Sequence, residues 1–585
     1  MNKREFDIMN ALLKEPFINQ RRVAELSGHS LGVVNKALKD LLKNGYIDKE
    51  SQLTDKAKEE FKLKKPQSAI ILAAGFGMRM VPINLTMTKA LLEVNGEVLI
   101  ERTIKQLNAV GIYDIYIVVG FMKEKFEYLI DEYGVKLIVN NDYAVKNNLH
   151  SLKLVVDKLD NSYIVPCDIW CDINPFSEYE LYSWYMVSDL IDDDSTVRVN
   201  RKNELVYVDA NKPGNKMIGI SYLLKEEANI VRERIKALIS NKRYDESFWE
   251  EALLEKNKMI VNAKVVHSSD VVEINTYEEL RDLDSNSNHL KSDSIDIISS
   301  SLGIEKDKIH DIKVLKKGMT NRSFLFCVNN EKYIMRIPGE GTDELINRKE
   351  ETSVYEVIRD RKICDDIIYI NPENGYKITK YIEGARCCNI DSIDDLKGCM
   401  RVLRKFHQME LKVDHGFNIF EKINFYESLW NGKNSIYKDY KKTKENILSL
   451  KEYIDRHVEK KVLTHIDAVP DNFLFTRDGD IRLIDWEYAA MQDPHVDIAM
   501  FCIYAMYDRE QVEQLIDLYF ENKCDKEIRI KIYAYIAVCG LLWSNWCEYK
   551  LQLGVEFGEY SIRQYRYAKD YYNLVKECLG RKYYV

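Results

Sequence analysis

The sequence predicts a multidomain α/β protein built from a small helical head, a doubly wound sheet and a larger C-terminal part. At 585 residues the chain is long enough for about three or four domains of ordinary size. Its composition changes abruptly after the charged linker 62–66, and a polar segment rich in Ser and Asn follows at 285–294. We therefore expect domains at residues 1–65, 66–288 and 295–585.

Composition narrows the class of protein. Hydrophobic residues make up 46% and charged residues 31% of the chain, which is typical of globular domains with their own cores. The net charge of −9 gives no general attraction to nucleic acids or anionic membranes. The 12 cysteines form no C-x-x-C pair, no apolar signal segment opens the chain, and no apolar run reaches about 18 residues. We expect a cytoplasmic protein with reduced thiols, no membrane span and no cysteine metal cluster.

The head carries apolar residues at helical spacing. Three helices are predicted, at Phe6 to Leu13, Val23 to Leu26 and Ser30 to Leu42, with Ser30 as the cap of the third. Residues 45–54 then predict a small hairpin. The pattern resembles a winged helix-turn-helix, in which residues 30–43 would take the position of the recognition helix.

The charges of this head leave two interpretations open. Basic side chains offer contacts to DNA phosphates, but acidic side chains lie between them, as a face used for dimerisation or domain packing would also allow. The basic residues are Arg21, Arg22, Lys36, Lys39 and Lys43, and the acidic residues are Asp40, Asp48 and Glu50. DNA is a candidate partner of the head, and homo-oligomerisation stays open.

The middle part opens on an apolar run at residues 68–74, which predicts a buried parallel strand. Gly75 and Gly77 follow it and let backbone N–H groups approach an anion, while Arg79 adds a fork of donors. These features predict a loop that holds phosphate groups.

Strands and helices alternate in the rest of this part. Residues 114–120 and 135–139 predict strands, and residues 124–133 predict a helix between them. Such alternation predicts a doubly wound parallel sheet, whose ligands lie at the carboxyl ends of the strands. Asp168 lies at one such end, because it follows the apolar strand 163–166.

The glycine loop and the segment after it resemble a nucleotidyltransferase signature, G-x-G-x-R followed by P-K-x-L. Enzymes with this signature join a nucleoside triphosphate to a sugar phosphate or to phosphocholine. Here Thr88-Lys89-Ala90-Leu91 lacks the proline, which favours the phosphocholine cytidylyltransferases. The resemblance implies that Lys89 and Arg79 are catalytic and neutralise phosphate charge. It implies nucleotide contacts from Ala73, Gly75, Gly77, Arg79, Asn148 and Ser151.

The same resemblance implies a Mg²⁺ site and a phosphocholine pocket. Asp168 matches the first metal-binding aspartate of the family, and Glu273 and Asn275 lie where the second is expected. Asn275 replaces an aspartate common in the family, and its amide oxygen can bind Mg²⁺ without adding charge. A quaternary ammonium needs an aromatic face, and the candidates are Trp184 and Trp170.

The segment from Leu463 to Ala489 gathers side chains suited to phosphoryl transfer. Asp467 is placed to accept a hydroxyl proton, while Asn472 and Asp485 offer the hard oxygens that Mg²⁺ prefers. Residue types and spacing together therefore predict a kinase site in the C-terminal part.

This spacing, H-x-D-x-x-x-x-N followed by I-D-W-E, resembles the catalytic and metal segments of the choline/ethanolamine kinase and aminoglycoside phosphotransferase group. The resemblance implies a bilobal protein-kinase-like domain in which Thr320, Asn321 and Arg336 approach ATP. Glu350 or Glu351 would form an ion pair with Arg336, and the resemblance prefers Glu351.

Aromatic residues near the C-terminus predict a site for a quaternary ammonium. Trp543 and Trp546 lie three residues apart on a predicted helix and hence on one face. They resemble the W-x-x-W pair that encloses the trimethylammonium group in choline kinases, with Tyr488 as a third wall and Asp467 beside the substrate hydroxyl. The resemblance makes His465 a brace of the catalytic loop, and His407 is expected to be structural.

Together these features predict a bifunctional Mg²⁺-dependent transferase. The C-terminal domain would phosphorylate choline with ATP, and the middle domain would convert phosphocholine and CTP to CDP-choline and pyrophosphate. One alternative is the same chemistry on ethanolamine, another amino alcohol or a phosphonate, although the tryptophans favour choline. Another is a DNA-binding regulator that senses CTP or choline, although such a sensor need not keep the catalytic acids.

Overall fold

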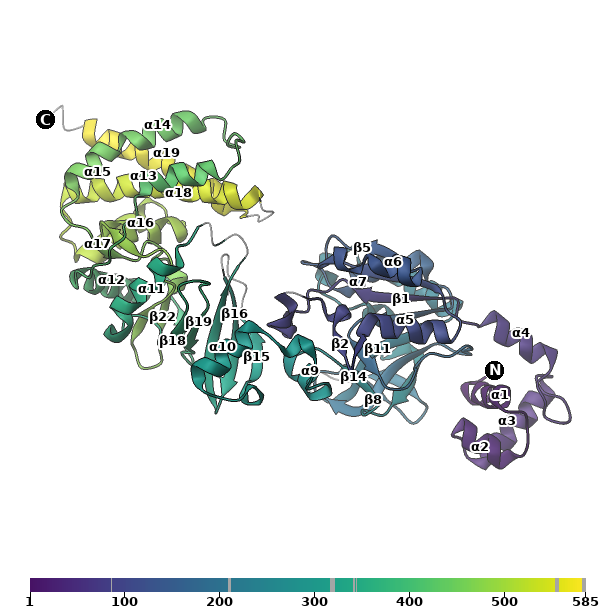
Figure 1. Cartoon of the computed structure of the whole chain (residues 1–585). Coiled ribbons are helices and arrows are strands. Elements are labelled where there is room, and N and C mark those ends of the chain that lie inside the picture. Colours follow the sequence, from purple (N-terminus) through teal and green to yellow (C-terminus); the bar gives the residue numbers. More distant parts are fainter. Residues whose placement is uncertain are drawn as a thin grey trace. The chain divides into compact units, whose positions relative to one another are not determined.

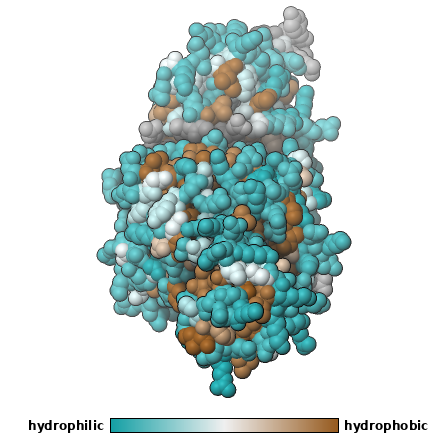
Figure 2. Space-filling model, turned by 90° about the vertical axis from the view of Figure 1, so that its right-hand side faces the viewer, coloured by the Kyte–Doolittle hydropathy of each residue, from teal (hydrophilic) through white to brown (hydrophobic). Residues whose placement is uncertain are grey.

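The computed structural model describes residues 1–85, 87–208, 212–315, 321–339, 342, 345–552 and 557–580. The chain divides into two compact units, residues 1–295 and 296–585 (Figure 1). The boundary between the units lies next to the polar segment 285–294. No helix among the described residues is long and apolar enough to cross a membrane. The face seen in Figure 2 is mostly hydrophilic, with apolar residues in separate patches.

The three predicted helices of the head are confirmed, and a fourth follows them. The four are α1 (Lys3–Lys14), α2 (Gln20–Ser27), α3 (Leu31–Lys43) and α4 (Asp55–Leu63). The predicted hairpin is reduced to a bridge between Ile47 and Leu53. Ser30 precedes α3 in an extended conformation, but its side chain makes no capping hydrogen bond. The apolar faces of the helices share one small core.

Helix α1 also attaches the head to the middle part. Asp7 accepts a hydrogen bond from the Tyr182 hydroxyl at 3.1 Å and lies 2.9 Å from Nε2 of His29. Lys3 donates to the carbonyl oxygen of Ala263 at 3.1 Å. Leu181 is buried in the core of the head. Because α1 makes this attachment, the outward face of α3 stays exposed at Lys36, Lys39 and Lys43.

The middle part is organised around a ten-stranded sheet. Its first half, β5-β4-β1-β6, is parallel as predicted. The second half is mixed, because β11 runs antiparallel to β6 and to β8, whereas β13 runs parallel to β8. The strands are β1 (Ser68–Ala73), β4 (Asp114–Val119), β5 (Lys136–Val139), β6 (Ser162–Pro166), β8 (Trp184–Asp192), β9 (Val197–Val199), β10 (Glu204–Tyr207), β11 (Gly214–Leu223), β12 (Leu254–Glu255) and β13 (Lys258–Val266).

Helices cover both faces of this sheet. Buried residues of α5 (Leu99–Ala109) and α6 (Tyr128–Tyr133) pack on one face, and those of α7 (Asn148–Lys153) and α8 (Lys225–Leu238) on the other. The predicted helix 124–133 is split into a 3₁₀ turn at Lys123–Phe126 and α6. The smaller elements are β2 (Glu93–Val94), β3 (Glu97–Val98), β7 (Ile169–Cys171), β14 (Val271–Glu273) and α9 (Tyr277–Leu283).

Helix α10 (Asp293–Leu302) spans the boundary between the units, and the second unit continues with a five-stranded antiparallel sheet in the order β15-β16-β17-β19-β18. Its strands are β15 (His310–Val314), β16 (Asn321–Val328), β17 (Glu331–Pro338), β18 (Ile367–Ile370) and β19 (Lys377–Lys380), and α11 (Arg348–Ile358) follows β17.

The rest of this unit is mainly helical, with α18 along its centre and α19 beside it (Figure 1). The helices are α12 (Ile393–Gln408), α13 (Ile419–Ser428), α14 (Tyr440–Ser449), α15 (Lys451–His457), α16 (His495–Tyr504), α17 (Arg509–Phe520), α18 (Lys526–Gln552) and α19 (Glu559–Gly580). Short strands carry the catalytic segment between them: β20 (Arg386–Cys387), β21 (Val462–Thr464), β22 (Phe473–Phe475), β23 (Ile481–Leu483) and β24 (Ala490–Gln492).

Candidate functional site

The first candidate site lies beyond the carboxyl ends of β1 and β6. Lys89 follows the glycine loop, and its Nζ lies 3.1 Å from Oδ2 of Asp168 and 2.6 Å from Oδ1 of Asn275. Arg79 reaches the same Asn275 oxygen at 3.4 Å. The structure thus brings together four of the predicted catalytic and metal-binding residues. Oxygen atoms that converge on the ammonium group of Lys89 in this way could also bind a divalent metal.

The glycine loop is shaped by its contact with Lys89. Gly77 has a φ of 62°, and a Cβ at this position would lie 3.0 Å from Cγ of Lys89. Both the backbone conformation and the close approach favour glycine. Gly75 has open space around it and is exposed, so its backbone is accessible to a phosphate. The side chain of Ala73 is buried at the end of β1.

A short strand pair places the second half of this site. β14 pairs with β7, which sets Glu273 opposite Ile169, and the amide of Ile274 donates to the carbonyl oxygen of Asp168 at 2.9 Å. Burial raises the pKa of Glu273, and the nearby charge of Asp168 raises it further. Lys216, which the sequence did not single out, lies 3.8 Å from Glu273. Asp168, Asn275 and Glu273 are therefore the groups that could hold Mg²⁺.

The predicted nucleoside contacts already have partners within the chain. Asn148 accepts a hydrogen bond from the backbone amide of Trp249 at 2.8 Å, and buried Ser151 accepts one from Asn140 at 3.0 Å. Aromatic rings not considered in the sequence analysis lie in the loops after β1 and β4. The rings of Phe76 and Phe121 are 4.2 Å apart between centres. They offer flat surfaces at the edge of the sheet where a base would stack.

The structure corrects the expectation that Trp184 binds the ammonium of phosphocholine. Trp184 opens β8, and its ring packs 6.0 Å from that of Tyr163, near the start of β6. Asp168 follows the carboxyl end of β6, so Trp184 lies near the amino end of this strand, away from Asp168. Its ring is 1% exposed and already faces a cation, because Nζ of Lys264 lies 3.9 Å from the ring centre.

Trp170 is nearer to Asp168 but is also engaged. The guanidinium of Arg102 lies 4.1 Å above its ring, and its Nε1 donates to Asp172 at 2.7 Å. One face of this ring is thus covered by a cation of the chain. The structure brings neither tryptophan into an open aromatic box.

The second candidate site is the catalytic segment of the C-terminal unit. Asn472 donates to the carbonyl oxygen of Asp467 at 2.9 Å and to its Oδ2 at 3.3 Å. Burial raises the pKa of Asp467 to about 8, and the charges of Asp485 and Glu487 contribute to the increase. The predicted acid, asparagine and second aspartate therefore form one cluster. Asp467 is a stronger base here than an ordinary aspartate.

Buried Asp497 holds the loop that carries Asp467. Its carboxylate accepts hydrogen bonds from the amides of His465 and Ile466 at 3.0 and 2.7 Å, and it lies 2.9 Å from Nε2 of His407. Ile466 has a φ of 66°, an uncommon conformation for a β-branched residue. Nε2 of His465 lies 3.0 Å from the carbonyl oxygen of Ile484. Both histidines are thus structural, as expected, and Asp497 is a residue that the sequence analysis missed.

Arg336 and Glu351 form the predicted ion pair, with two contacts of 2.5 and 2.9 Å. Although burial opposes ionisation of Glu351, Arg336 lowers its pKa. Arg336 also lies 3.8 Å from both Asp485 and Glu487. Asn321 donates to Glu487 at 2.9 Å. Glu487 belongs to the I-D-W-E motif, but the sequence analysis did not predict it as a site residue. Thr320, predicted to approach ATP, lies outside the described residues, and Glu350 does not pair with Arg336 among the described ones.

The predicted aromatic group is assembled next to this acidic cluster. The rings of Trp543 and Trp546 are 5.7 Å apart and nearly perpendicular, and Tyr488 meets Trp543 at 5.7 Å. Tyr426, a further ring, stacks on Trp543 at 6.3 Å. Nζ of Lys550 lies 5.8 Å from the ring of Trp546. Tyr488 directly follows Glu487 in the chain, which connects the aromatic rings to the catalytic segment.

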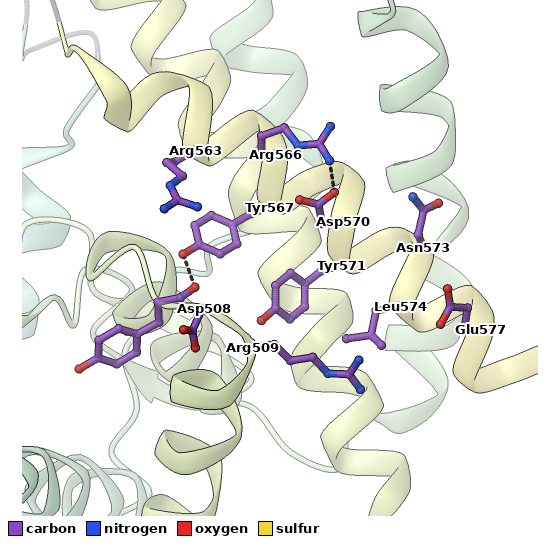
Figure 3. Close-up of a pocket in the computed structure, with 11 residues that line it drawn as sticks. Asp508, Arg509, Arg563, Arg566, Tyr567, Asp570, Tyr571, Asn573, Leu574 and Glu577 are labelled. Carbon is purple, nitrogen blue, oxygen red and sulfur yellow. Dashed lines mark hydrogen bonds and ion pairs between the residues drawn. The ribbon is translucent and has the colours of Figure 1, made fainter.

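A separate cavity of about 330 Å³ lies between the start of α17 and α19 (Figure 3). It contains none of the predicted site residues. Two of its arginines are engaged within α19, since Arg566 pairs with Asp570 and Arg563 with Glu559. Tyr567 donates to the carbonyl oxygen of Tyr507 at 2.6 Å. This cavity is not part of either candidate site.

Comparisons with known proteins match all three parts. Family models match residues 1–48 as a winged helix-turn-helix DNA-binding domain, 69–173 as a MobA-like NTP transferase domain and 312–538 as a choline/ethanolamine kinase. The choline-phosphate cytidylyltransferase of Streptococcus pneumoniae is 33% identical over 228 residues, which cover 37% of this chain and 96% of that protein. The chain belongs to the choline-phosphate cytidylyltransferase family.

Two further relatives bear on the two catalytic parts. Protein LicA of Haemophilus influenzae is 26% identical over 261 residues, which cover 42% of this chain and 76% of that protein. The 2-aminoethylphosphonate cytidylyltransferase of Lancefieldella rimae is 28% identical over 233 residues, which cover 37% of this chain and 92% of that protein. The chain thus joins a cytidylyltransferase part and a choline kinase part behind a winged-helix head, as predicted.

Asp467→Asn should stabilise the ligand-free kinase part at alkaline pH. Folding raises the pKa of Asp467 from 3.8 to about 8, so the folded state binds this proton more tightly than the unfolded chain. The contribution of this group to stability is therefore complete below about pH 4 and is lost as pH rises toward about 8. At about 1.4 kcal/mol for each pKa unit, the uncharged amide should leave the protein more stable by several kcal/mol at pH 8.5.

Urea unfolding without Mg²⁺ or nucleotide, at about pH 6 and about pH 8.5, measures this difference. Asp478→Asn, on an exposed turn of the same segment, is the matched control and should follow the wild type. Equal stability of Asp467→Asn and wild type at the higher pH would contradict the prediction.

Proposed function

We propose that this protein makes CDP-choline from choline in two steps, using ATP in the C-terminal part and CTP in the middle part. The observation that carries the proposal is that one chain assembles both sites. Lys89 joins Asp168 to Asn275 in the first unit, and Asp467, Asn472 and Asp485 cluster in the second. Phosphocholine, the product of the second unit, is the substrate of the first. The order of reactions is thus the reverse of the order of domains.

In the kinase part, Asp467 would accept the hydroxyl proton of choline as the oxygen attacks the γ-phosphorus of ATP. Its raised pKa suits this task, because a base whose pKa is near the working pH accepts a proton readily. Arg336, fixed by Glu351, would face the ATP phosphates. Asn472 and Asp485 would hold Mg²⁺, which supplies charge neutralisation at the phosphates when bound. Transfer of the phosphoryl group leaves ADP and phosphocholine.

In the cytidylyltransferase part, a phosphate oxygen of phosphocholine would attack the α-phosphorus of CTP, and pyrophosphate would leave. No covalent enzyme intermediate is needed. Lys89 and Arg79 would face the phosphates and offset the negative charge that develops in transfer. Asp168, Asn275 and Glu273 would hold Mg²⁺, which adds positive charge at the phosphates when bound. Only Asp168 and Glu273 can supply negative charge to the metal, because Asn275 is neutral.

The aromatic rings support choline as the substrate of the kinase. A trimethylammonium group donates no hydrogen bond and is attracted to ring faces, which Trp543, Trp546 and Tyr488 provide. The alternatives are ethanolamine or another amino alcohol for the kinase and, for the cytidylyltransferase part, a phosphonate, which appears in the name of one relative. An amine that carries N–H groups would favour carboxylates over a box of rings. Choline is therefore the substrate that we propose.

Variants of the two sites should separate the two activities. Lys89→Met keeps the aliphatic stem that packs on Gly77 but removes the charge, and should slow CDP-choline formation by about 100-fold or more. Asp467→Asn should stop phosphocholine formation. Each variant should leave the other step unchanged. ³¹P NMR of the purified protein with choline, ATP, CTP and Mg²⁺ follows both products. In a second sample, phosphocholine replaces choline and ATP.

The outcomes of this experiment are distinct. Phosphocholine followed by CDP-choline and pyrophosphate supports both assignments. If either variant stops both steps while the protein stays folded, the assignment of the steps to the two parts is wrong. If choline and phosphocholine both stay unconverted by the wild type, the proposal of choline as substrate fails, and ethanolamine and 2-aminoethylphosphonate are then tested under the same conditions.

Trp546→Ala should lower the kcat/KM of the kinase more for choline than for ethanolamine. A desolvated cation over an aromatic ring is worth about 1–2 kcal/mol, so kcat/KM for choline should fall by roughly 5–30-fold. Trp546→Phe keeps a ring and should recover most of the loss. A coupled assay of ADP release with each substrate gives the ratio. An equal loss for both substrates in Trp546→Ala would show that the ring packs the fold without selecting the ammonium.

The head supports a second candidate function, which is binding to duplex DNA. Helix α3 keeps its outward face exposed, with Lys36, Lys39 and Lys43 along it, while α1 makes the contacts to the middle part. Arg22 is less available, because it pairs with Glu15 and Glu25. Binding would therefore depend on the lysines of α3. The partner would be contacted mainly through its phosphates.

Replacing Lys36 and Lys39 together by Glu should abolish this binding. Each lost phosphate contact reduces the slope of log affinity against log salt by about 0.9. Fluorescence anisotropy of a labelled duplex, measured over a salt series, gives affinity and slope. Lys441→Glu with Lys442→Glu makes the same charge change on exposed α14 and should bind as the wild type does. No binding by the wild type at about 50 mM salt would leave the head as a packing module.

A further inference from the structure

A bulge in the sheet of the kinase part brings three metal-ligating side chains together. β15 and β16 pair with His310 opposite Cys327 and with Lys313 opposite Leu325, so β15 contains one extra residue between these pairs. In a regular strand, successive side chains point to opposite faces. The bulge changes this, and the side chain of Asp311 joins that of His310, with Oδ2 of Asp311 2.9 Å from Nδ1 of His310.

The backbone at this bulge adopts the left-handed conformation at one residue. Asp311 has a φ of 54°, in the left-handed region. Aspartate is one of the few residues other than glycine that adopt this conformation, because its short side chain can form local hydrogen bonds. The same conformation turns the carboxylate of Asp311 toward His310 and Cys327. The left-handed conformation is thus coupled to the convergence of three side chains that are each able to bind a metal.

The geometry of the three groups suits a small cation. One ligand atom from each of His310, Asp311 and Cys327 can be chosen so that all three lie within 4.8 Å of one another. Cys327 is 7% exposed and fixed in the strand, whereas the other two side chains are partly exposed and free to close on an ion. Bonds of about 2.0–2.3 Å to nitrogen, oxygen and sulfur would need these atoms to move closer by roughly 1 Å.

Charges around the cluster do not prevent binding of a cation. Lys332 is the partner of Cys327 on β17, but its ammonium is held by Glu383 at 2.6 Å. Lys313 lies on β15 at the other end of the bulge. The cluster itself carries the carboxylate of Asp311 and would gain a thiolate on binding. A divalent ion would thus be neutralised by its own ligands.

We propose that His310, Asp311 and Cys327 form a site for Zn²⁺ or a similar divalent transition metal. The combination of imidazole, carboxylate and thiolate is typical of zinc and does not suit Mg²⁺, which prefers oxygen alone. Formation of the metal–sulfur bond releases the thiol proton of Cys327 to solvent, with no change of oxidation state. Water completes the coordination. This site is distinct from the catalytic one, because Cys327 lies near the end of β16 and Asn321 opens it, about 20 Å away along the strand.

The expected role of the metal is to fasten β15 to β16. β16 carries Asn321, which donates to Glu487 in the catalytic segment. A metal bond between the two strands would limit the movement of β16 against its neighbour. Zn²⁺ should therefore raise the unfolding temperature of the kinase part, in addition to any effect on activity.

Cobalt titration of the full-length protein tests the site directly. Co²⁺ bound to a thiolate gives an intense near-ultraviolet charge-transfer band, which oxygen ligands do not give. With excess Mg²⁺ present to occupy the catalytic sites, the wild type should show this band and saturate at one Co²⁺ per chain. Cys327→Ser should lose the band. Cys387→Ser removes an exposed cysteine elsewhere in the same unit and should behave as the wild type does.

A second measurement guards against misfolding of the variant. Circular dichroism should show wild-type secondary structure for Cys327→Ser, and His310→Ala should weaken Zn²⁺ binding by at least about tenfold in competition with a chelating dye. Zn²⁺ should raise the unfolding temperature of the wild type and of Cys387→Ser, but not that of Cys327→Ser. Absence of the cobalt band from the wild type, or its persistence in Cys327→Ser, would overturn the proposal.

Discussion

In both catalytic parts, cations supplied by the chain hold acidic and amide oxygens close together. Lys89 lies between Asp168 and Asn275, and Arg336 lies among Glu351, Asp485 and Glu487. Like charges gathered at this separation repel one another, and burial strengthens the repulsion. The chain cations offset part of this cost before any substrate arrives. The same residues can then face substrate phosphates, so a structural requirement and a catalytic one are met by the same side chains.

The two parts differ in how fully their cations offset the repulsion between the acidic groups. In the kinase part, burial and the charges of Asp485 and Glu487 raise the pKa of Asp467, so repulsion there is not cancelled by Arg336. In the cytidylyltransferase part, Asn275 brings an oxygen without a charge. The number of negative charges around Lys89 is therefore smaller. A neutral ligand at this position reduces repulsion in the empty site and also reduces the attraction that the site offers to Mg²⁺.

The catalytic loop of the kinase part depends on a further buried carboxylate. Ile466 and Asp485 both have positive φ values, of 66° and 65°, which are unfavourable for residues other than glycine. Asp497 accepts hydrogen bonds from two consecutive amides at this loop and is fixed in turn by His407. Charge-assisted hydrogen bonds to a buried carboxylate are stronger than neutral ones and can offset such strain. The loop thus keeps Asp467 in place at the cost of conformations that are rarely populated.

The sequence predicted the cluster around Asp467 from residue types and spacing within one segment, whereas resemblance to known families implied the other two groups of residues. The pair Arg336 and Glu351, the cluster around Asp467 and the convergence of Lys89 with Asp168 and Asn275 are present in the structure. Trp184 was misplaced, because its position in the chain does not reveal which end of β8 faces the site. Asp497 was missed for a similar reason, since it reaches the catalytic loop only through the packing of α16. No strand of the large sheet was predicted after residue 166, and its second half is mixed, because β11 runs antiparallel to both of its neighbours, β6 and β8.

One carboxylate takes part both in the fold of the head and in its attachment to the middle part. Asp7 contacts both His29, inside the head, and Tyr182, in the middle part, so the group that stabilises the helical head also fixes it to its neighbour. Tyr182 lies next to Leu181, whose side chain is buried in the core of the head. The contact is therefore apolar at its centre and hydrogen-bonded at its edge, as stable interfaces are. Since α1 makes these contacts and the lysines at positions 36, 39 and 43 of α3 are exposed, these lysines stay available to a partner while the head remains joined to the cytidylyltransferase part.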